Sequence, residues 1–359
     1  MPIDFSPQDW KRIKETYRKW WAGELDRPLF YAAVGGQDPG RAEAKVPNMG
    51  RTARYPFSLS AEDVVDRWDY DLSCRKYVGD GFPSVWLDFG PGVLAAFLGA
   101  QTGVDENTVW FHPTEDREIP DIRFSLDLQH PWMKRIESLI RAAQKRWGSQ
   151  VQLGMTDLGG NLDILSTFRP SEKLLLDLYD HPDQVKRLTW EAHEMWWKAF
   201  DHLNRVLQPI NPGYTAWVPI FSEQPHYMLQ CDFCYMIGTG MFDEFVKPEL
   251  AATCKKLAHP FYHLDGPGQL AHLDSLLAIP ELRGVQWIPG AGAAPPRAWP
   301  EVYRKVRDAG KLMQVVGDLD DLRIVIEALG DGKGIYWSGG VGRDKEHELM
   351  KFLEKYGAA

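Results

Sequence analysis

Four segments in the last third of the chain decide the fold: PFYHLDGPG at residues 260–268, RGVQWIPGAG at 283–292, KLMQVVGDLD at 311–320 and GKGIYWSGG at 332–340. Each is a nearly continuous apolar run that ends in Gly, Asp or Pro, as expected for a strand buried on both faces of a sheet. The runs begin about 20–30 residues apart, which is the length of a compact strand–loop–helix unit. This part of the chain therefore predicts parallel strands joined by helices.

Earlier in the chain the same pattern occurs four more times. The runs are RPLFYAAVGG at 27–36, SVWLDFGPG at 84–92, QVQLGMTDLGG at 150–160 and TAWVPIFSE at 215–223. Amphipathic helical patterns lie between the runs, the clearest of them after Pro131 and Pro182. Eight strands that alternate with helices predict a (β/α)8 barrel, with an open doubly wound sheet as the alternative. We expect residues 1–359 to form one such domain.

Long loops follow the first two predicted strands. Residues 35–58 are rich in Gly and Pro, and residues 102–124 predict a hairpin or an extended arm. Loops of this length in a compact barrel are more often lids or binding loops than accidents.

Composition excludes several classes of protein. The formal net charge is −9, which argues against a nucleic-acid-binding surface. The four cysteines are too few for a disulfide framework, so we expect a reducing, cytoplasmic location. No apolar run approaches the length of a membrane span, and the N-terminus does not resemble a signal peptide. The 15 Trp residues suit a pocket for a planar ligand as well as a core, so the expected partner is a small molecule.

In a (β/α)8 barrel the active site forms where the strands end, so the residues at those positions are candidates. As catalytic residues we predict His263, Asp265, Asp88 and Glu223, and as substrate-binding residues Asp157, Asp232, Trp287, Asp318 and Trp337. The alternative for an aspartate just after a strand is the N-cap of the next helix. We assign that structural role to Asp320 and keep it open for Asp318. Each tryptophan could stack on a ligand or fill the top of the barrel.

His263 and Asp265 form the sharpest cluster. They stand two residues apart, so in a strand both side chains lie on one face. A histidine beside a carboxylate can act as a general acid or base, or the two can bind zinc or another divalent metal. A catalytic zinc site needs about three protein ligands, and Glu223 or Asp318 could supply the third. The structural alternative is a His–Asp hydrogen bond that only closes the rim.

Two further motifs are weaker signals. Asp232 stands between Cys231 and Cys234, and we place it on the loop above the fourth strand as a substrate contact. A lone CxxC pair is more often two buried thiols than a zinc knuckle. The loop at 338–342, SGGVG, could hold a phosphate on backbone N–H groups. The GxGxxG, GxxxxGK[ST] and GxSxG patterns of dinucleotide-binding, P-loop and α/β-hydrolase proteins do not occur at the required places.

Several motifs together resemble the uroporphyrinogen decarboxylase superfamily. They are Asp88, the stretch DFCYMIGTGMFDEFVKPEL at 232–250, and the segments FYHLDGPG, VQWIPG and GDLD. The resemblance covers nearly the whole chain and implies a (β/α)8 barrel with its site at the carboxyl ends of the strands. It also implies one of two chemistries. The first is decarboxylation of uroporphyrinogen. The second is methyl transfer from a corrinoid protein through zinc held by an HxC pair and a later Cys.

The chain departs from both chemistries at specific positions. The Arg-rich segment of the decarboxylase is replaced by AAVGGQDPGR with only Arg41 close by, and Ser338 or a neighbour stands where the decarboxylase has a late His. In the methyltransferase motif Asp265 replaces the first thiolate, and no Cys follows Cys254. A His/Asp site would be a stronger Lewis acid than a sulfur-rich one. No DxHxxG motif occurs, so a corrinoid would arrive on a partner protein.

Three functional hypotheses follow. The first is a corrinoid-linked methyltransferase in which His263 and Asp265 activate the methyl donor or acceptor and Trp287 stacks on a ligand. The second is a decarboxylase or related lyase, in which Asp88 stabilises a protonated intermediate and His263 supplies the proton. The third is a non-catalytic binder of a tetrapyrrole or another planar ligand.

Overall fold

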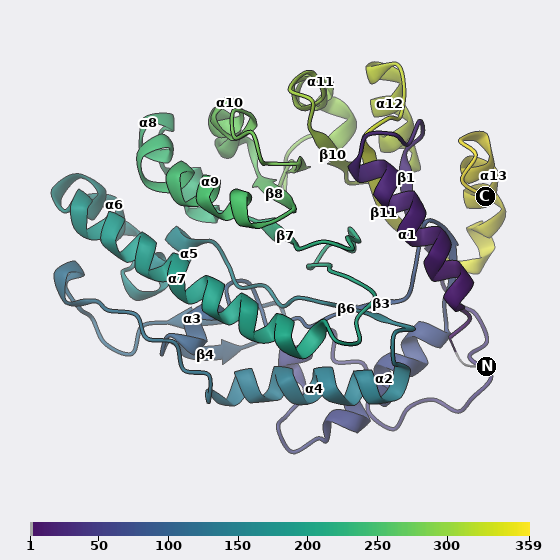
Figure 1. The fold of residues 1–359 in the computed structure, drawn as a ribbon, viewed down its shortest axis with the longest axis horizontal. Helices are drawn as coiled ribbons and strands as arrows, with labels where there is room; N and C mark the ends of the chain where they lie inside the picture. Colours follow the sequence, from purple (N-terminus) through teal and green to yellow (C-terminus); the bar gives the residue numbers. More distant parts are fainter. Residues whose placement is uncertain (1–2) are drawn as a thin grey trace.

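A mixed seven-stranded sheet organises the protein, for which a computed structural model describes residues 3–359 (Figure 1). The strand order is β2–β1–β11–β10–β9–β8–β7, and every neighbouring pair is parallel except β1 and β2. The strands are β1 (Leu29–Val34), β2 (Lys76–Gly79), β7 (His226–Leu229), β8 (His259–Asp265), β9 (Gly284–Ile288), β10 (Leu312–Val315) and β11 (Ile335–Val341). The parallel strands therefore end at one common edge.

Two smaller sheets complete the strand pairing. One joins β3 (Ser84–Trp86) and β6 (Gln152–Gly154) in parallel. The other is an antiparallel hairpin of β4 (Gln101–Val104) and β5 (Val109–His112), which lies in the segment where the sequence predicts a hairpin or an arm.

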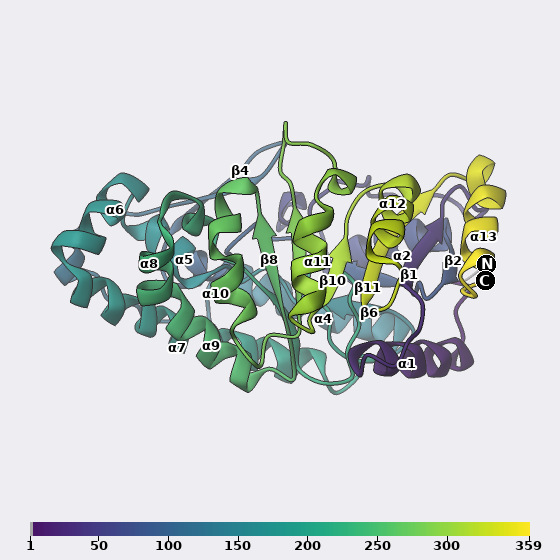
Figure 2. The same cartoon turned by 90° about the horizontal axis from the view of Figure 1, so that it is seen from above.

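Helices alternate with the strands, as the sequence predicts. In Figure 1 the helices from α8 to α13 form a row along one side of the large sheet, whereas α2, α4 and α7 lie on the opposite side of the molecule. Figure 2 shows the row of α10 to α13 from above, with α1 along one margin. The helices are α1 (Pro7–Trp21), α2 (Ala61–Ser73), α3 (Leu94–Phe97), α4 (Pro131–Trp147), α5 (Asn161–Phe168), α6 (Ser171–Asp180), α7 (Pro182–Leu207), α8 (Thr239–Met241), α9 (Lys247–Lys256), α10 (Leu273–Leu277), α11 (Pro300–Asp308), α12 (Leu319–Leu329) and α13 (Glu346–Lys355).

Short helical turns occupy several connections. One of them, η3, is separated from the end of β7 by two residues, and another, η4, continues from α8 into α9 with π-helical geometry. The turns are η1 (Thr52–Arg54), η2 (Ile119–Asp121), η3 (Asp232–Met236), η4 (Phe242–Val246), η5 (Pro267–His272), η6 (Pro296–Ala298) and η7 (Arg343–Lys345).

Local sequence explains where the main helices begin and end. Ser6 and Asp9 form a capping box that starts α1. Pro131 and Pro182 each occupy the first helical position of α4 and α7, where the missing N–H costs nothing. Gly330 ends α12 in the left-handed conformation with φ of 87°, which a residue with a Cβ rarely adopts.

The prediction of a strand at 215–223 is wrong. These residues form an irregular segment with one isolated bridge between Tyr214 and Ser222, and the strand is β7, which begins after them at His226. Pro219 lies in the middle of the predicted run and has no N–H to donate to a neighbouring strand. Seven of the eight predicted strands are present, and β7 takes the place of the eighth.

Closure of the strands into a complete barrel stays a prediction. The chain next to the small β3–β6 sheet makes two close contacts with other parts of the molecule. Gly81, just before β3, packs so closely on Ala32 of β1 that a Cβ would lie 2.2 Å from its carbonyl oxygen. Just after β6, the Met155 N–H donates to the carbonyl of Thr215, in the irregular segment that precedes β7, at 2.8 Å. These contacts place the chain next to the small sheet against β1 and against the segment that precedes β7.

One continuous hydrophobic core fills the molecule. Its largest buried side chains include Trp20, Trp287, Phe30 and Phe221, which come from distant parts of the sequence. Much of the tryptophan excess is therefore core packing. Among the described residues, no helix has the length and apolar character needed to cross a bilayer.

Candidate metal-binding and substrate site

A cluster of three side chains lies beyond the carboxyl ends of β7 and β8. His263 and Asp265 project from the same face of β8, because side chains two residues apart in a strand share a face. Asp232 begins the η3 turn, three residues after the end of β7. One ligand atom from each of the three side chains lies within 4.8 Å of the other two.

Strand register explains why Asp232 joins the pair. β7 and β8 run parallel with Leu229 opposite Tyr262. Asp232 lies three residues beyond Leu229, and Asp265 lies three residues beyond Tyr262. The two carboxylates therefore reach the same level above the sheet. The sequence suggested Glu223 or Asp318 as a third ligand, but the structure brings Asp232 there instead.

The donor set suits a divalent metal ion. One imidazole nitrogen and two carboxylate oxygens are ligands that zinc accepts, with bonds of about 2.0–2.2 Å. Donors of a tetrahedral zinc ion lie about 3.4 Å apart, so the cluster would have to contract by only a small rotation of its side chains. Asp232 is exposed and the other two residues are half-buried, so the cluster is open to solvent and to a substrate.

Hydrogen bonds behind His263 fix its orientation. Its Nδ1 faces the Oε1 of Gln286, the residue directly opposite on β9. The Gln286 amide nitrogen donates to Gln314 at 2.7 Å, and the Gln314 amide nitrogen points to the Ser338 hydroxyl at 3.4 Å. Because Oε1 of Gln286 accepts, Nδ1 carries the proton, and the Nε2 lone pair is free for a metal or a substrate proton. This ladder of neutral polar side chains was not predicted from the sequence.

Asp163 holds the turn that carries Asp232. It lies in the first turn of α5 and accepts the backbone N–H groups of Asp232 at 3.0 Å and Phe233 at 2.8 Å, which holds the η3 turn in place. Gly160 permits this approach, because a Cβ there would lie 2.2 Å from the Gln230 carbonyl oxygen. The sequence reasoning missed Asp163, although an acidic residue in the first turn after a Gly-rich strand end was a signal that could have found it.

The acidic groups in this region hold protons more tightly than ordinary carboxyls. Burial, together with the neighbouring charge of Asp232, raises the pKa of Asp163 to about 7. The pKa of Asp232 is also raised, by desolvation and by Asp265, against the opposing effect of His263. A cation at the cluster would relieve this repulsion.

Asp157 is a buried carboxyl near the same end of the sheet. It lies after β6 and accepts the Gly159 N–H at 2.8 Å, with Tyr227 and Gln230 at 3.5 Å. Burial raises its pKa to about 7, although the Gly159 N–H lowers it. At neutral pH a substantial fraction of this group is therefore protonated.

Asp88 lies after β3 in an ion pair. The guanidinium of Arg51 is 2.9 Å from Asp88, and the Gly90 N–H donates to the same carboxylate at 3.1 Å. Burial raises the pKa of Asp88, and the two donors only partly offset that effect. Asp88 is not one of the three residues of the His263 cluster.

Glu223 does not lie at the carboxyl end of the strands, and the expectation that it does is wrong. It precedes β7, so it lies at the amino end of that strand, where it pairs with Arg18 of α1 at 2.7 Å. The error follows from the misplaced fourth strand.

The remaining predicted residues lie in packing or capping positions. Asp318 is the N-cap of α12 and forms a capping box with Asp321, which is the alternative that the sequence left open. Trp287 is 1% exposed and packs edge-on against Trp299, and Trp337 is 3% exposed and donates its indole N–H to the Gly317 carbonyl at 3.0 Å. Neither indole has a free face for a ligand to stack on.

A different tryptophan lies beside the cluster. The ring of Trp217 meets the His263 ring edge-on, with centroids 6.1 Å apart, and is half-buried. It belongs to the irregular segment that the sequence assigned to a strand. Its position there makes it a better candidate for ligand contact than Trp287 or Trp337.

Cysteine is not part of the cluster. Cys231 and Cys234 are buried on either side of Asp232, and burial raises the pKa of both thiols. A raised pKa disfavours the thiolate that binds metals, so these residues behave as buried thiols.

Comparisons with known proteins define the fold. The chain is similar to the structure of a methyltransferase from Methanosarcina mazei, with a TM-score of 0.59 and 14% sequence identity over 96% of this chain and 97% of that one. No protein-family model and no curated protein matches the sequence. At this identity the likeness is one of fold, and it extends over nearly the whole of both chains.

Proposed function

We propose that this protein is a methyltransferase that acts on a small molecule together with a corrinoid protein partner. The observation that carries the proposal is the Asp232–His263–Asp265 cluster at the carboxyl edge of the sheet. The chain has the fold of a methyltransferase, and the sequence motifs resemble the uroporphyrinogen decarboxylase superfamily, whose members form closed (β/α)8 barrels. On this proposal the sheet closes into such a barrel, and the cluster lies in its mouth.

The residues of the cluster fit a divalent metal cofactor. Asp232, His263 and Asp265 would hold zinc or a similar ion, and such an ion supplies Lewis acidity that makes a bound hydroxyl or ether oxygen more reactive. A donor set with two carboxylates and no thiolate favours oxygen-centred substrates over thiols.

Neighbouring side chains hold the residues of the cluster in position. Gln286 holds the His263 ring so that Nε2 points away from the ladder. Asp163 fixes the η3 turn and so places the Asp232 carboxylate. Trp217 meets the His263 ring edge-on and borders the cluster on that side.

A decarboxylase or lyase is the second candidate function. The raised pKa of Asp157 favours it, because a buried carboxyl that is half-protonated near pH 7 is suited to proton transfer. A binder that only stacks planar ligands loses support, because Trp287 and Trp337 are buried.

A methyl-transfer assay tests the proposal. Purified protein is loaded with Zn²⁺ and incubated with methylcobalamin and a panel of phenol, thiol and tetrahydrofolate acceptors, and the loss of methylcobalamin absorbance is followed. We expect turnover with at least one acceptor. His263→Ala should reduce it by more than about 100-fold, whereas Glu223→Gln, a carboxylate change at the opposite end of the strands, should not. Turnover that survives His263→Ala, or release of CO₂ from carboxylated compounds in place of methyl transfer, would overturn the proposal.

A further inference from the structure

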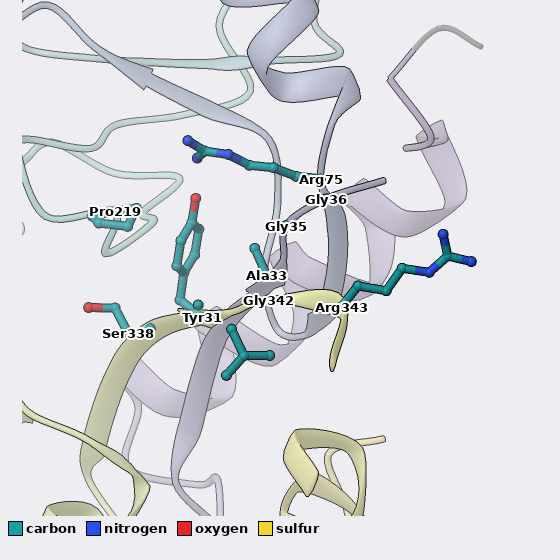
Figure 3. A pocket seen from close by; sticks show the side chains of 12 residues that line it. Tyr31, Ala33, Gly35, Gly36, Arg75, Pro219, Ser338, Gly342 and Arg343 are labelled. Carbon is teal, nitrogen blue, oxygen red and sulfur yellow. The ribbon is translucent and has the colours of Figure 1, made fainter. Parts of the chain in front are cut away.

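A second feature of the same edge is a cavity of about 670 Å³ at the carboxyl ends of β1 and β11 (Figure 3). Its size falls in the range of about 300–1,000 Å³ that is typical of small-molecule sites. The chain has a net charge of −9, yet the residues that line this cavity include two arginines, Arg75 and Arg343, and no carboxylate. The cavity is therefore a local basic region on an acidic protein.

Glycine keeps the cavity open. Gly35 and Gly36 follow β1, and the run 339–342 contributes three more glycines from β11 and the residue after it. β1 and β11 pair along their whole length, so these two stretches lie side by side. Gly36 has a φ of 76°, a conformation that favours glycine. The lack of side chains leaves backbone and space where a ligand can approach.

Arg75 supplies the cation that faces into this space. In Figure 3 its side chain extends over the hydroxyl of Tyr31, whereas Arg343 points away from Tyr31. Burial raises the pKa of Tyr31, and the charge of Arg75 acts in the opposite direction, which places the guanidinium within electrostatic reach of the hydroxyl. Among the described residues, no carboxylate lies within 4.0 Å of the Arg75 guanidinium. This charge is thus available to a ligand.

The cavity adjoins the His263 cluster in two ways. Ser338, which lines the cavity, is the far end of the hydrogen-bonded ladder that runs through Gln314 and Gln286 to His263. Pro219, which also lines the cavity, lies two residues after Trp217, whose ring meets His263. A ligand in the cavity and a group at the cluster would therefore lie at the same edge of the sheet.

We propose that this cavity is the recognition site for an oxyanion, a carboxylate or a phosphate, on the small-molecule substrate, with Arg75 as the residue that binds it. A guanidinium binds both oxyanions through two parallel N–H groups. Asp232 and Asp265 repel an oxyanion, so the charged end of the substrate is directed to the Arg75 cavity and the other end to the His263 cluster. The inference rests on the proposed function only in that the bound molecule is the substrate of the His263 cluster.

Calorimetric titration of the metal-free full-length protein tests the site. The probes are benzoate, phenyl phosphate and the neutral benzamide. We expect one of the oxyanions to bind at least about tenfold more tightly than benzamide. The tighter of benzoate and phenyl phosphate shows whether the site is built for a carboxylate or for a phosphate. Arg75→Gln should weaken that binding by at least about tenfold, and Arg343→Gln, the other cavity arginine, by less than threefold. Failure of both oxyanions to bind, or equal losses in the two variants, would overturn the assignment.

A matched pair of substitutions keeps the test independent of any folding defect in Arg75→Gln. Gly35 lines the cavity, and a Cβ there would meet only the Val341 carbonyl oxygen at 3.8 Å, an ordinary contact. Gly35→Asp and Gly35→Asn add side chains of equal size that differ in charge. Asp should lower oxyanion affinity at least about tenfold more than Asn does, and equal effects would contradict the proposal. His263→Ala should keep oxyanion binding while it loses methyl transfer, so failure of the proposed function is distinguishable from failure of this site.

Discussion

The two ends of one sheet edge carry opposite charge. At the ends of β7 and β8, Asp232 and Asp265 lie beside His263, and the half-buried Asp163 accepts the backbone N–H of Asp232. At the ends of β1 and β11, a cavity contains Arg75 and no carboxylate. Neutral side chains, Gln286 and Gln314, link the two regions. Parallel strands of one sheet can therefore create two different binding environments, one suited to a cation and one to an anion.

Removing the negative charge of the first region is expected to have the largest effect. The double variant Asp232→Asn, Asp265→Asn keeps the size of the side chains but loses both anionic donors. Its zinc affinity should fall by more than about 100-fold, measured by competition with a chromophoric chelator. Benzoate or phenyl phosphate affinity should not fall, because the Arg75 cavity is unchanged. A parallel loss in both affinities would show that the two regions are not separate.

Asp157→Asn is expected to change the free energy of unfolding rather than the zinc affinity. The pKa of Asp157 in the folded protein is about 7, well above that of an unfolded aspartate. The folded state therefore binds more protons between about pH 4 and 7, and its stability falls as pH rises through that window. Asn mimics the protonated form, so the variant should be more stable than wild type by up to about 4 kcal/mol at pH 8 and nearly equal at pH 4.

Urea denaturation at the two pH values measures this effect. Asp320→Asn, an exposed position in α12, serves as the control. The free energy of unfolding of wild type should fall relative to that of Asp157→Asn between pH 4 and pH 8. A relative rise over the same range would contradict the raised pKa of Asp157.

Breaking the ladder between the two regions is expected to have a moderate effect. Gln286→Leu removes the acceptor for His263 Nδ1–H and should weaken zinc binding about tenfold, as loss of a partner behind a metal ligand commonly does. Gln314→Leu acts one residue further away and should cost less than threefold. Zinc titration of both variants checks the order, and a larger loss in Gln314→Leu would be inconsistent with the ladder.

Trp287→Phe is expected to have the smallest effect on binding. Its indole packs against Trp299 inside the core. Zinc and oxyanion affinities should change by less than about twofold, while the free energy of unfolding falls by about 1 kcal/mol. A large loss of ligand binding in this variant would restore the stacking role that the sequence suggested.

Sequence patterns could predict most of the fold because buried parallel strands have a strong signature. Seven apolar runs that end in Gly, Asp or Pro are strands. β7 was missed because it is four residues long, begins with His226 and follows a more apolar run that contains Pro219. Whether the strands close into a barrel depends on pairing between distant segments, which periodicity does not report.

The candidate site could be predicted only in part. His263 and Asp265 are two residues apart, so local geometry already places them on one face. Asp232 reaches them through the register of β7 and β8, and Arg75 reaches its cavity from the end of α2. Contacts of this kind form only in the tertiary structure, so a local sequence pattern does not reveal them. The wrong position of Glu223 has another cause, because it followed from the misplaced boundary of a single strand.

A crystal soaked in Zn²⁺ and measured at the zinc absorption edge tests the central claim most directly. The account predicts one strong anomalous peak about 2.0–2.2 Å from an Asp232 oxygen, an Asp265 oxygen and the His263 Nε2. The peak should disappear in His263→Ala crystals that diffract equally well. No peak at these residues, or a peak that persists without the imidazole, would contradict the claim that they form one metal-binding site.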